Sequence, residues 1–328
     1  MYFIDCLRAI ATILITNSHY SEIWPISALA IGGLLGNVLF FAISGFCLFN
    51  VKENFGKWYL KRILRIYPVV IAFTAITVML GFHSLTSFSD AVKLFIYPTN
   101  YVFLVWLMIC YAGFYLVVWC DKKFNLSIQK VLVGLIVVWL IVYLAFIDKS
   151  YYHIDQVHKP FILFLYFACM LIGGGFRKYY QKFLKSNCKL LEVFLLVVSL
   201  GLYFATKIVF SKLESLSYLQ ILNQITIFAV VYFAFKTFIS LEEKLKTLPS
   251  IVIKPIKFLA KITLQIYIVQ FVIILKLKHL VFPLNFVVVT ALIILVAYLL
   301  YLVEFYVRKL IEKLKENLRN NKNAKSQN

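Results

Sequence analysis

Residues 130–147 read KVLVGLIVVWLIVYLAFI, a stretch whose single charge stands at its first position. A bilayer core about 30 Å thick needs about 20 apolar residues at about 1.5 Å each, so this stretch predicts a helix that crosses a membrane. The chain carries ten stretches of this kind, and no soluble domain fits between them. We therefore predict an all-α polytopic membrane protein whose ten spans cover residues 3–20, 29–50, 66–82, 100–119, 130–147, 160–176, 190–209, 219–239, 258–277 and 284–306.

The composition of the whole chain supports the same class. Of its 328 residues 62% are hydrophobic and 15% charged, whereas soluble domains are about 45–50% apolar and about 25% charged. This excludes an ordinary soluble enzyme, and also a disordered chain, which needs low hydrophobicity. The net charge of +20 would suit a nucleic-acid partner. Its cations lie between apolar runs, however, where membrane proteins carry them, and we expect no nucleic acid.

The distribution of Lys and Arg predicts the orientation of the spans. With the N-terminus inside, 26 of the 34 cations fall on the cytoplasmic side and seven outside, and Arg8 lies within the first span. This asymmetry predicts that both termini are cytoplasmic, in agreement with an even number of spans. We divide the chain into a membrane domain, residues 1–306, and a basic cytoplasmic tail, residues 307–328, in which we expect a short interfacial helix from Arg308 onwards.

The first span carries three ionisable side chains, Asp5, Arg8 and His19. Such groups within a span are costly and are functional candidates by default. Eleven residues separate Arg8 from His19, which is three helical turns plus about 20°, so both should lie on one face about 16 Å apart. Asp5 precedes Arg8 by three residues and could pair with it. The alternative is that Asp5 and Arg8 extend to the cytoplasmic interface while His19 ends the helix outside.

Two further motifs follow the first span. Residues 40–46 read FFAISGF, in which Ser44 and Gly45 interrupt an apolar run, and residues 58–68 read WYLKRILRIYP. In the second motif, Arg62 and Arg65 are three residues apart and share one helix face. Paired guanidinium groups can bind phosphate through two hydrogen bonds each. The alternative is that these arginines are ordinary cytoplasmic cations beside a span.

These motifs, in this order and spacing, resemble the membrane-bound acyltransferase-3 family. The resemblance rests on D-x-L-R-A-I-A from Asp5, the R-x10-H spacing, F-F-x-x-S-G-F and Y-L-x-R-I-L-R-I-Y-P. Trp106 with FYLVV at 114–118, and FLAKITLQIYIVQ at 258–270, look like two later signatures of the family. The chain departs from some members in having Met108, Ile109 and Cys110 after that tryptophan, and Gln270 where many members have histidine.

The resemblance implies a function and a set of roles. Such proteins have about ten helices and move an acyl group, usually acetyl from acetyl-CoA, to a hydroxyl of a cell-surface glycan. It implies that His19 and Arg8 form the essential catalytic pair and that Arg62 and Arg65 match conserved arginines of a cytoplasmic loop. To these two arginines we assign the binding of acetyl-CoA. Asp5, Ser44, Gly45 and Trp106 would support the site. The partners would be acetyl-CoA, membrane lipids and a surface polysaccharide or its lipid-linked precursor, and the location a bacterial inner membrane.

The chemistry of acyl transfer assigns a task to each of these groups. A base must take the proton of the hydroxyl, and neutral imidazole, whose ordinary pKa is about 6.5, suits that task at neutral pH. A donor must stabilise the oxyanion of the tetrahedral intermediate. Cations must hold CoA on the cytoplasmic side. We expect an extended pantetheine arm to bring the thioester towards His19, so that the acyl group crosses the membrane while CoA does not.

A multi-span transporter or flippase is the main alternative, because it would also have about ten helices and buried ionisable residues. We expect no metal site, since the other histidines lie at outer loop ends and the cysteines are scattered without a C-x-x-C pair. The run Gly173–Gly175 before Arg177 could hold a phosphate, but glycines at span ends more often mark close helix packing.

Overall fold

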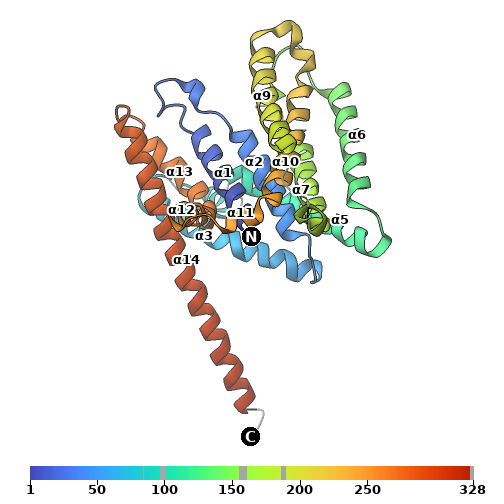
Figure 1. Ribbon diagram of the computed structural model, residues 1–328. Coiled ribbons are helices and arrows are strands. Elements are labelled where there is room, and N and C mark those ends of the chain that lie inside the picture. The colour runs from blue at the N-terminus through green and yellow to red at the C-terminus, as the bar shows by residue number, and fades with distance from the viewer. Residues whose placement is uncertain (84, 97–100, 155–160, 186–189, 326–328) are drawn as a thin grey trace. The chain divides into compact units, whose positions relative to one another are not determined.

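The computed structural model describes residues 1–83, 85–96, 101–154, 161–185 and 190–325, and every regular element in those ranges is a helix. The all-α class predicted from the sequence is confirmed. The long helices (Figure 1) are α1 (Tyr2–Ser18), α2 (Gly33–Leu48), α3 (Phe55–Met79), α5 (Val102–Phe124), α6 (Ile128–Phe146), α7 (Phe161–Lys178), α9 (Leu190–Lys212), α10 (Ile221–Ser240), α12 (Ser250–Lys261), α13 (Thr263–Leu277) and α14 (Leu284–Lys325). The short helices are α4 (Phe88–Phe95), α8 (Tyr180–Leu184) and α11 (Glu242–Lys246), with 3₁₀ turns at Ser27–Leu29 and Glu214–Leu219.

Eight of the helices in the described residues are long and apolar enough to cross a membrane, and α12 with α13 makes a ninth if the pair counts as one broken span. Each of the ten predicted stretches is occupied by helix. The first, α1, has 17 residues, which covers about 26 Å and is shorter than the bilayer core of about 30 Å. By length and composition alone, the described helices therefore make eight or nine spans and not the ten predicted.

Two local expectations are wrong. The predicted span at 258–277 is not one helix, because Ile262 separates α12 from α13. The tail does not form a short helix of its own, because α14 runs without a break from Leu284 to Lys325. The sequence has no Gly or Pro between residues 284 and 325, so nothing in it ends the helix at the membrane surface.

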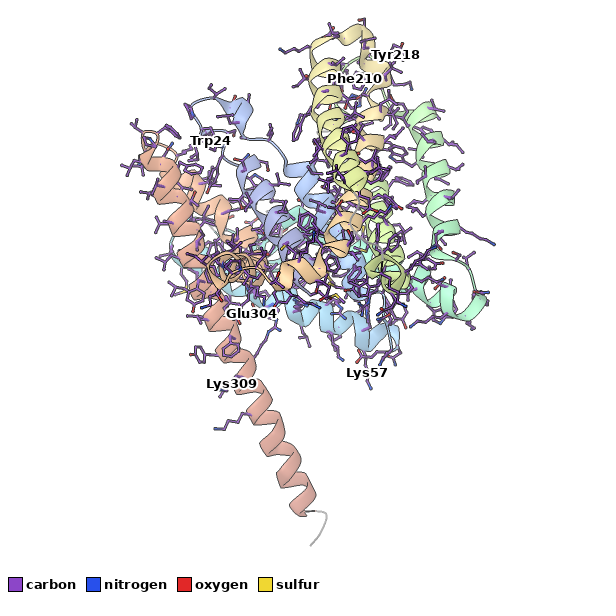
Figure 2. All side chains as sticks on the ribbon, viewed as in Figure 1. Trp24, Lys57, Phe210, Tyr218, Glu304 and Lys309 are labelled. Carbon is purple, nitrogen blue, oxygen red and sulfur yellow. The ribbon has the colours of Figure 1, made fainter. Side chains whose placement is uncertain are left out.

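The chain divides into two compact units. The first unit comprises Met1–Ser18, Ala30–Leu60 and Val102–Lys261, and the second comprises His19–Leu29, Lys61–Tyr101 and Ile262–Asn328. Within the first unit, the side chains of Phe210 and Tyr218 lie at one end and that of Lys57 at the other (Figure 2). The positive-inside count predicts the same separation, with Lys57 cytoplasmic and Tyr218 outside.

The core of the first unit is the crossing of α2 and α7, which lie side by side (Figure 1). A Cβ on Gly45 would lie 1.9 Å from the carbonyl oxygen of Met170, and one on Gly173 would lie 1.8 Å from that of Ala42. The two glycines thus bring the backbones of both helices into direct contact, as small residues do in membrane proteins. The packing interpretation of the glycine run is therefore the one that the structure supports at Gly173.

Other helices of the first unit surround this crossing. Only 17% of the most apolar 18-residue stretch is buried in α6, and the same share in α9. Most side chains of these two helices therefore face away from the unit, as expected of helices in contact with lipid. α6 packs through Trp139, whose ring stacks on Phe161 of α7 with centroids 5.7 Å apart. α9 packs along α10, where buried Glu192 pairs with Lys236 at 3.1 Å.

The second unit is organised by α13 and α14. Gln265 donates a hydrogen bond of 2.6 Å to Glu304, which also forms an ion pair with Arg308. The segment 19–29 packs on the start of α14: the side-chain amide of Asn285 donates to the carbonyl of Ile23 at 2.9 Å, and Trp24 contacts Phe286 with ring centroids 4.7 Å apart. In Figure 2, Trp24 lies near one end of α14, and Glu304 and Lys309 lie further along this helix.

Candidate active site

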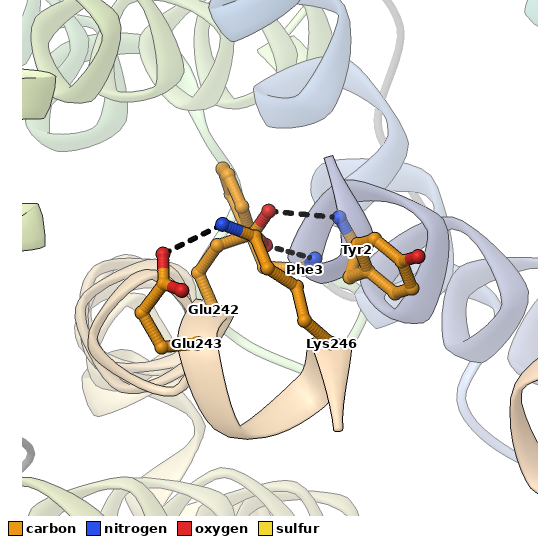
Figure 3. A network of polar contacts seen from close by, with 5 residues as sticks. All are labelled: Tyr2, Phe3, Glu242, Glu243 and Lys246. Atoms are coloured by element: carbon orange, nitrogen blue, oxygen red, sulfur yellow. Dashed lines mark hydrogen bonds and ion pairs between the residues drawn. The ribbon is translucent and has the colours of Figure 1, made fainter. Parts of the chain in front are cut away.

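The N-terminus of α1, the helix that carries Arg8, is fixed by a buried carboxylate (Figure 3). Glu242 of α11, with only 4% of the residue exposed, accepts hydrogen bonds from the backbone N–H groups of Tyr2 at 3.1 Å and Phe3 at 2.8 Å. The first N–H groups of a helix have no partner within it, and a negative charge there is favourable for the helix dipole. Lys257 of α12 adds a cation over the ring of Tyr2, 3.9 Å from its centre. The position of α1 is therefore set by residues about 240 positions away.

Arg8 lies one and a half turns along this helix and is partly buried. Its carbonyl accepts a hydrogen bond of 2.8 Å from the hydroxyl of Thr12. Asp5 is also partly buried, but the ion pairs formed among the described residues do not join Asp5 to Arg8. The structure thus places both side chains on α1 without the pairing that the sequence suggests.

His19 is the residue directly after α1, in a turn, and belongs to the second unit. Its ring is partly buried and packs on Phe271 of α13, with the ring centroids 4.4 Å apart and the planes tilted by 58°. The following Tyr20 is buried and its hydroxyl lies 2.9 Å from that of Thr290. An aromatic contact on one side and a hydrogen bond beside it hold this turn in place.

Arg62 and Arg65 lie on α3, as predicted, three residues apart. Arg62 is partly buried and Arg65 is exposed. A third arginine joins them: Arg308 of α14 donates from Nη2 to the backbone carbonyl of Arg65 at 3.4 Å. We had assigned Arg308 to the tail, and no local sequence pattern connects residues 243 positions apart. The second unit thus contains three arginines on α3 and α14, called the arginine cluster below: Arg62, Arg65 and Arg308, the last of which also pairs with Glu304.

The remaining supporting residues take part in helix packing. Ser44 is buried in α2, and its hydroxyl oxygen accepts a hydrogen bond of 3.5 Å from Tyr111 of α5. Gly45 beside it makes the backbone contact with α7 described above. Trp106 is partly buried on α5. The S-G-F motif therefore has a direct structural explanation in the packing of α2, α5 and α7.

Arg177 is a cation that sequence reasoning did not select. At the end of α7 its guanidinium packs over the ring of Phe46, 5.2 Å from the centroid. With the Asn50 amide oriented so that its oxygen faces the guanidinium, that oxygen accepts from Nη2 and Nε of Arg177 at 3.1 and 3.2 Å. These contacts tie the C-terminal ends of α2 and α7 together.

The other histidines and the cysteines that the structure describes show no comparable arrangement. His153 is buried and its Nδ1 lies 2.9 Å from the carbonyl oxygen of Tyr151. His158 and Cys188 lie outside the described residues. Among the residues that the structure describes, no three His, Cys, Asp or Glu side chains gather as a metal site would require.

Comparison with known proteins bears on the class of reaction. Comparisons with curated proteins and with solved structures find no match. The profile of the acyltransferase-3 family, described as an acyltransferase domain, matches residues 1–303. The matched range contains every candidate residue from Asp5 to Trp106. The chain therefore belongs to the acyltransferase-3 family and is a multi-pass membrane acyltransferase.

Proposed function

We propose that the protein is an O-acyltransferase of the bacterial inner membrane that moves an acetyl group from acetyl-CoA to a hydroxyl of a cell-surface polysaccharide or its lipid-linked precursor. The observation that carries the proposal is the position of His19, a partly buried imidazole held against Phe271 at the end of the helix that carries Arg8. Acyltransfer to a hydroxyl needs a base in a restricted site, and His19 meets that requirement.

The proposed step balances as follows. The imidazole of His19 takes the proton of the acceptor hydroxyl while the oxygen attacks the carbonyl carbon of the thioester. The tetrahedral intermediate then collapses, the carbon–sulfur bond breaks, and the CoA sulfur leaves with the proton returned by the imidazolium. The products are the acetyl ester and CoA with a free thiol. No oxidant, reductant or metal is needed.

In the proposal, the arginine cluster of Arg62, Arg65 and Arg308 supplies the positive charge that binds the phosphate groups of the donor. CoA carries a pyrophosphate and a further phosphate, and guanidinium groups bind phosphate oxygens through paired N–H donors. A single arginine could not neutralise this charge. In the proposal these three residues hold the nucleotide of acetyl-CoA at the cytoplasmic side, and Arg8 contacts the donor further along its length.

The length of α1 sets the distance that the pantetheine arm of the donor would have to cover. Ten residues separate Arg8 from the end of the helix at Ser18, which is about 15 Å of rise, half the thickness of the bilayer core. An extended pantetheine arm can cover such a distance. We propose that the acetyl group alone crosses the membrane, from a donor bound on the cytoplasmic side to an acceptor on the outer side.

A transporter or flippase is the second candidate, and one observation favours it. The α12–α13 pair is broken at Ile262, and discontinuous membrane helices often form substrate sites in transporters. A transporter would carry its substrate across the membrane without consuming acetyl-CoA. Dependence on acetyl-CoA therefore distinguishes the two candidates.

The test uses cells of the native host from which the chromosomal copy has been removed, so that the natural acceptor is present. Membranes containing equal amounts of wild type, His19→Gln or His279→Gln receive labelled acetyl-CoA, and label in the glycan is measured. His279 is the control, because it is an exposed histidine. We expect label with wild type and His279→Gln and at least a hundredfold less with His19→Gln, since general-base catalysis contributes about 10²–10⁴ in rate.

The alternative outcomes are equally informative. No label with wild type would refute acetyl transfer to a glycan. Full activity of His19→Gln would show that another residue is the base. For the donor site, Arg62→Ala and Arg65→Ala should raise the KM for acetyl-CoA about tenfold or more, whereas Lys57→Ala, an exposed cation at the start of the same helix, should not.

A further inference from the structure

A cavity of about 620 Å³ lies entirely within the first unit. Its size falls in the range of about 300–1,000 Å³ that is typical of ligand sites. One wall is formed by Ser18 at the end of α1 and by Ala30–Leu34, which lead into α2. The other wall is formed by Tyr151 and Tyr152 after α6, by the C-terminal part of α9, and by Glu214 at the start of the following 3₁₀ turn.

The first wall is shaped by glycines. The amide of Asn17 donates a hydrogen bond of 3.0 Å to the carbonyl of Ile31. Gly32 adopts φ +102°, a left-handed conformation that other residues avoid, and a Cβ on Gly33 would lie 2.5 Å from the hydroxyl oxygen of Ser18. The segment can therefore lie directly on the end of α1 only because these two residues lack side chains.

The second wall is held by one fully buried amide. Gln220 has 0% exposure, and its Oε1 accepts hydrogen bonds from the backbone N–H groups of His153 at 3.0 Å and Ile154 at 2.9 Å. Its Nε2 donates to the carbonyl of Tyr151 at 3.0 Å. All three bonds go to backbone groups, so none of them depends on the side chain of the exposed Tyr151, whereas Tyr152 also packs against the core cluster around Trp139 and Tyr143.

The side chains that line the cavity combine aromatic faces with polar groups. Tyr151 and Tyr152 present an apolar ring and a hydroxyl together, and the buried Tyr203 lies behind them in the wall. Lys207 supplies a cation, Glu214 an anion, and Ser18 and Ser211 supply hydroxyl groups. A saccharide has the matching chemistry, because its ring carries apolar C–H faces that lie on aromatic rings and hydroxyl groups that exchange hydrogen bonds at its edges.

The place of the cavity in the chain also points to the acceptor. Its lining residues come from segments that the positive-inside count places on the outer side, including Lys207. Ser18 lines it, and Ser18 immediately precedes His19, so the Cα atoms of these two residues are about 3.8 Å apart. A ligand in this cavity would reach the end of α1 from the side opposite to the cytoplasm.

We infer that this cavity binds the acceptor saccharide, with Tyr151 and Tyr152 under its ring and Lys207, Glu214 and the two serines on its hydroxyl groups. The inference rests on the proposed function and names the site at which the hydroxyl substrate is held.

The experiment uses native-host cells that lack the chromosomal copy and carry one variant each. Tyr151→Ala and Lys207→Ala remove cavity contacts, and Ser211→Trp fills the cavity from an exposed position. The matched controls are Tyr218→Ala and Lys212→Ala, which remove an exposed tyrosine and an exposed lysine of the same region that do not line the cavity. Two quantities are measured: O-acetyl groups in the surface glycan, and binding of acetyl-CoA to the purified protein.

We expect each cavity variant to lower glycan acetylation at least fivefold while its Kd for acetyl-CoA stays within a factor of two of wild type, and both controls to resemble wild type. Cavity variants with wild-type acetylation would overturn the inference and leave the proposed function intact. Loss of acetyl-CoA binding together with acetylation would also overturn it, because the cavity would then serve the donor or the fold. A wild type that acetylates no glycan would refute the proposed function, and the inference with it.

Discussion

Replacing Gly173 with alanine tests the backbone contact between α2 and α7. The added Cβ would lie 1.8 Å from the carbonyl oxygen of Ala42, whereas a carbon and an oxygen that are not bonded need roughly 3 Å or more. A backbone carbonyl within a helix cannot rotate away, so the two helices must separate by about 1 Å. Overpacking of this kind costs about 1–3 kcal/mol, and we place this substitution at the upper end, at about 3 kcal/mol.

The same glycine run provides the control. A Cβ on Gly175, two residues further along α7, would meet no atom within 4 Å. Alanine is a better helix former than glycine by about 0.5–1 kcal/mol, so Gly175→Ala should stabilise the protein slightly. The two variants differ in position by two residues and in the expected sign of the effect.

The assay is thermal unfolding in detergent. Unfolding is monitored through the reaction of newly exposed thiols with a fluorogenic maleimide. Cys6, Cys110 and Cys169 are buried and report unfolding, and the three other cysteines, Cys47, Cys120 and Cys188, are first replaced by serine to remove background. At about 2–4 °C per kcal/mol, Gly173→Ala should lower Tm by about 6–12 °C. If Gly173→Ala proved as stable as Gly175→Ala, the description of α2 and α7 as helices in backbone contact would be wrong.

Three further predictions concern contacts between distant residues. Glu242→Ala should lower the free energy of unfolding by about 3 kcal/mol, because two buried N–H groups of α1 lose a charged acceptor; Glu243→Ala, whose side chain is 71% exposed, should have almost no effect in the same thermal assay. Gln220→Ala should raise the rate of hydrogen exchange at the amides of His153 and Ile154 at least tenfold, and unchanged exchange would show that these amides have another acceptor. Arg308→Ala should raise the KM for acetyl-CoA as Arg62→Ala does, and a KM equal to that of wild type would remove Arg308 from the donor site.

The positions of the helices could be predicted from the sequence because each apolar run determines a helix locally. The stretch predicted at 130–147 and the helix α6 at Ile128–Phe146 agree to within two residues. The break at Ile262 could not be predicted in this way, since residues 258–270 contain neither glycine nor proline. The extension of α14 to Lys325 was missed for a related reason: a change from apolar to polar residues marks the membrane surface and does not end a helix.

The candidate residues are selected from motifs, and their roles stay predictions. The structure places Arg62 and Arg65 on one helix and His19 beside Phe271. The partners of these residues could not be found, because Glu242 and Arg308 act across about 240 positions. The role of Gly45 is also clearer in three dimensions, where it faces Met170 across a helix crossing. The glycine of the S-G-F motif therefore has a packing role in this chain.

The hydrogen bonds from the Gln220 side chain to the segment after α6 have a consequence for how the lining of the cavity can change. The amide holds only main-chain atoms of residues 151–154, so substitutions at 151 and 152 leave every one of these bonds in place. The side chain of the exposed Tyr151 can then change at little risk to folding, as in an antibody loop carried on a constant framework. Tyr152 is less free to change, because it also packs against the core cluster around Trp139 and Tyr143. Under the proposed function, a different acceptor saccharide can then be accommodated by exchanging an exposed side chain on a segment whose path is already fixed.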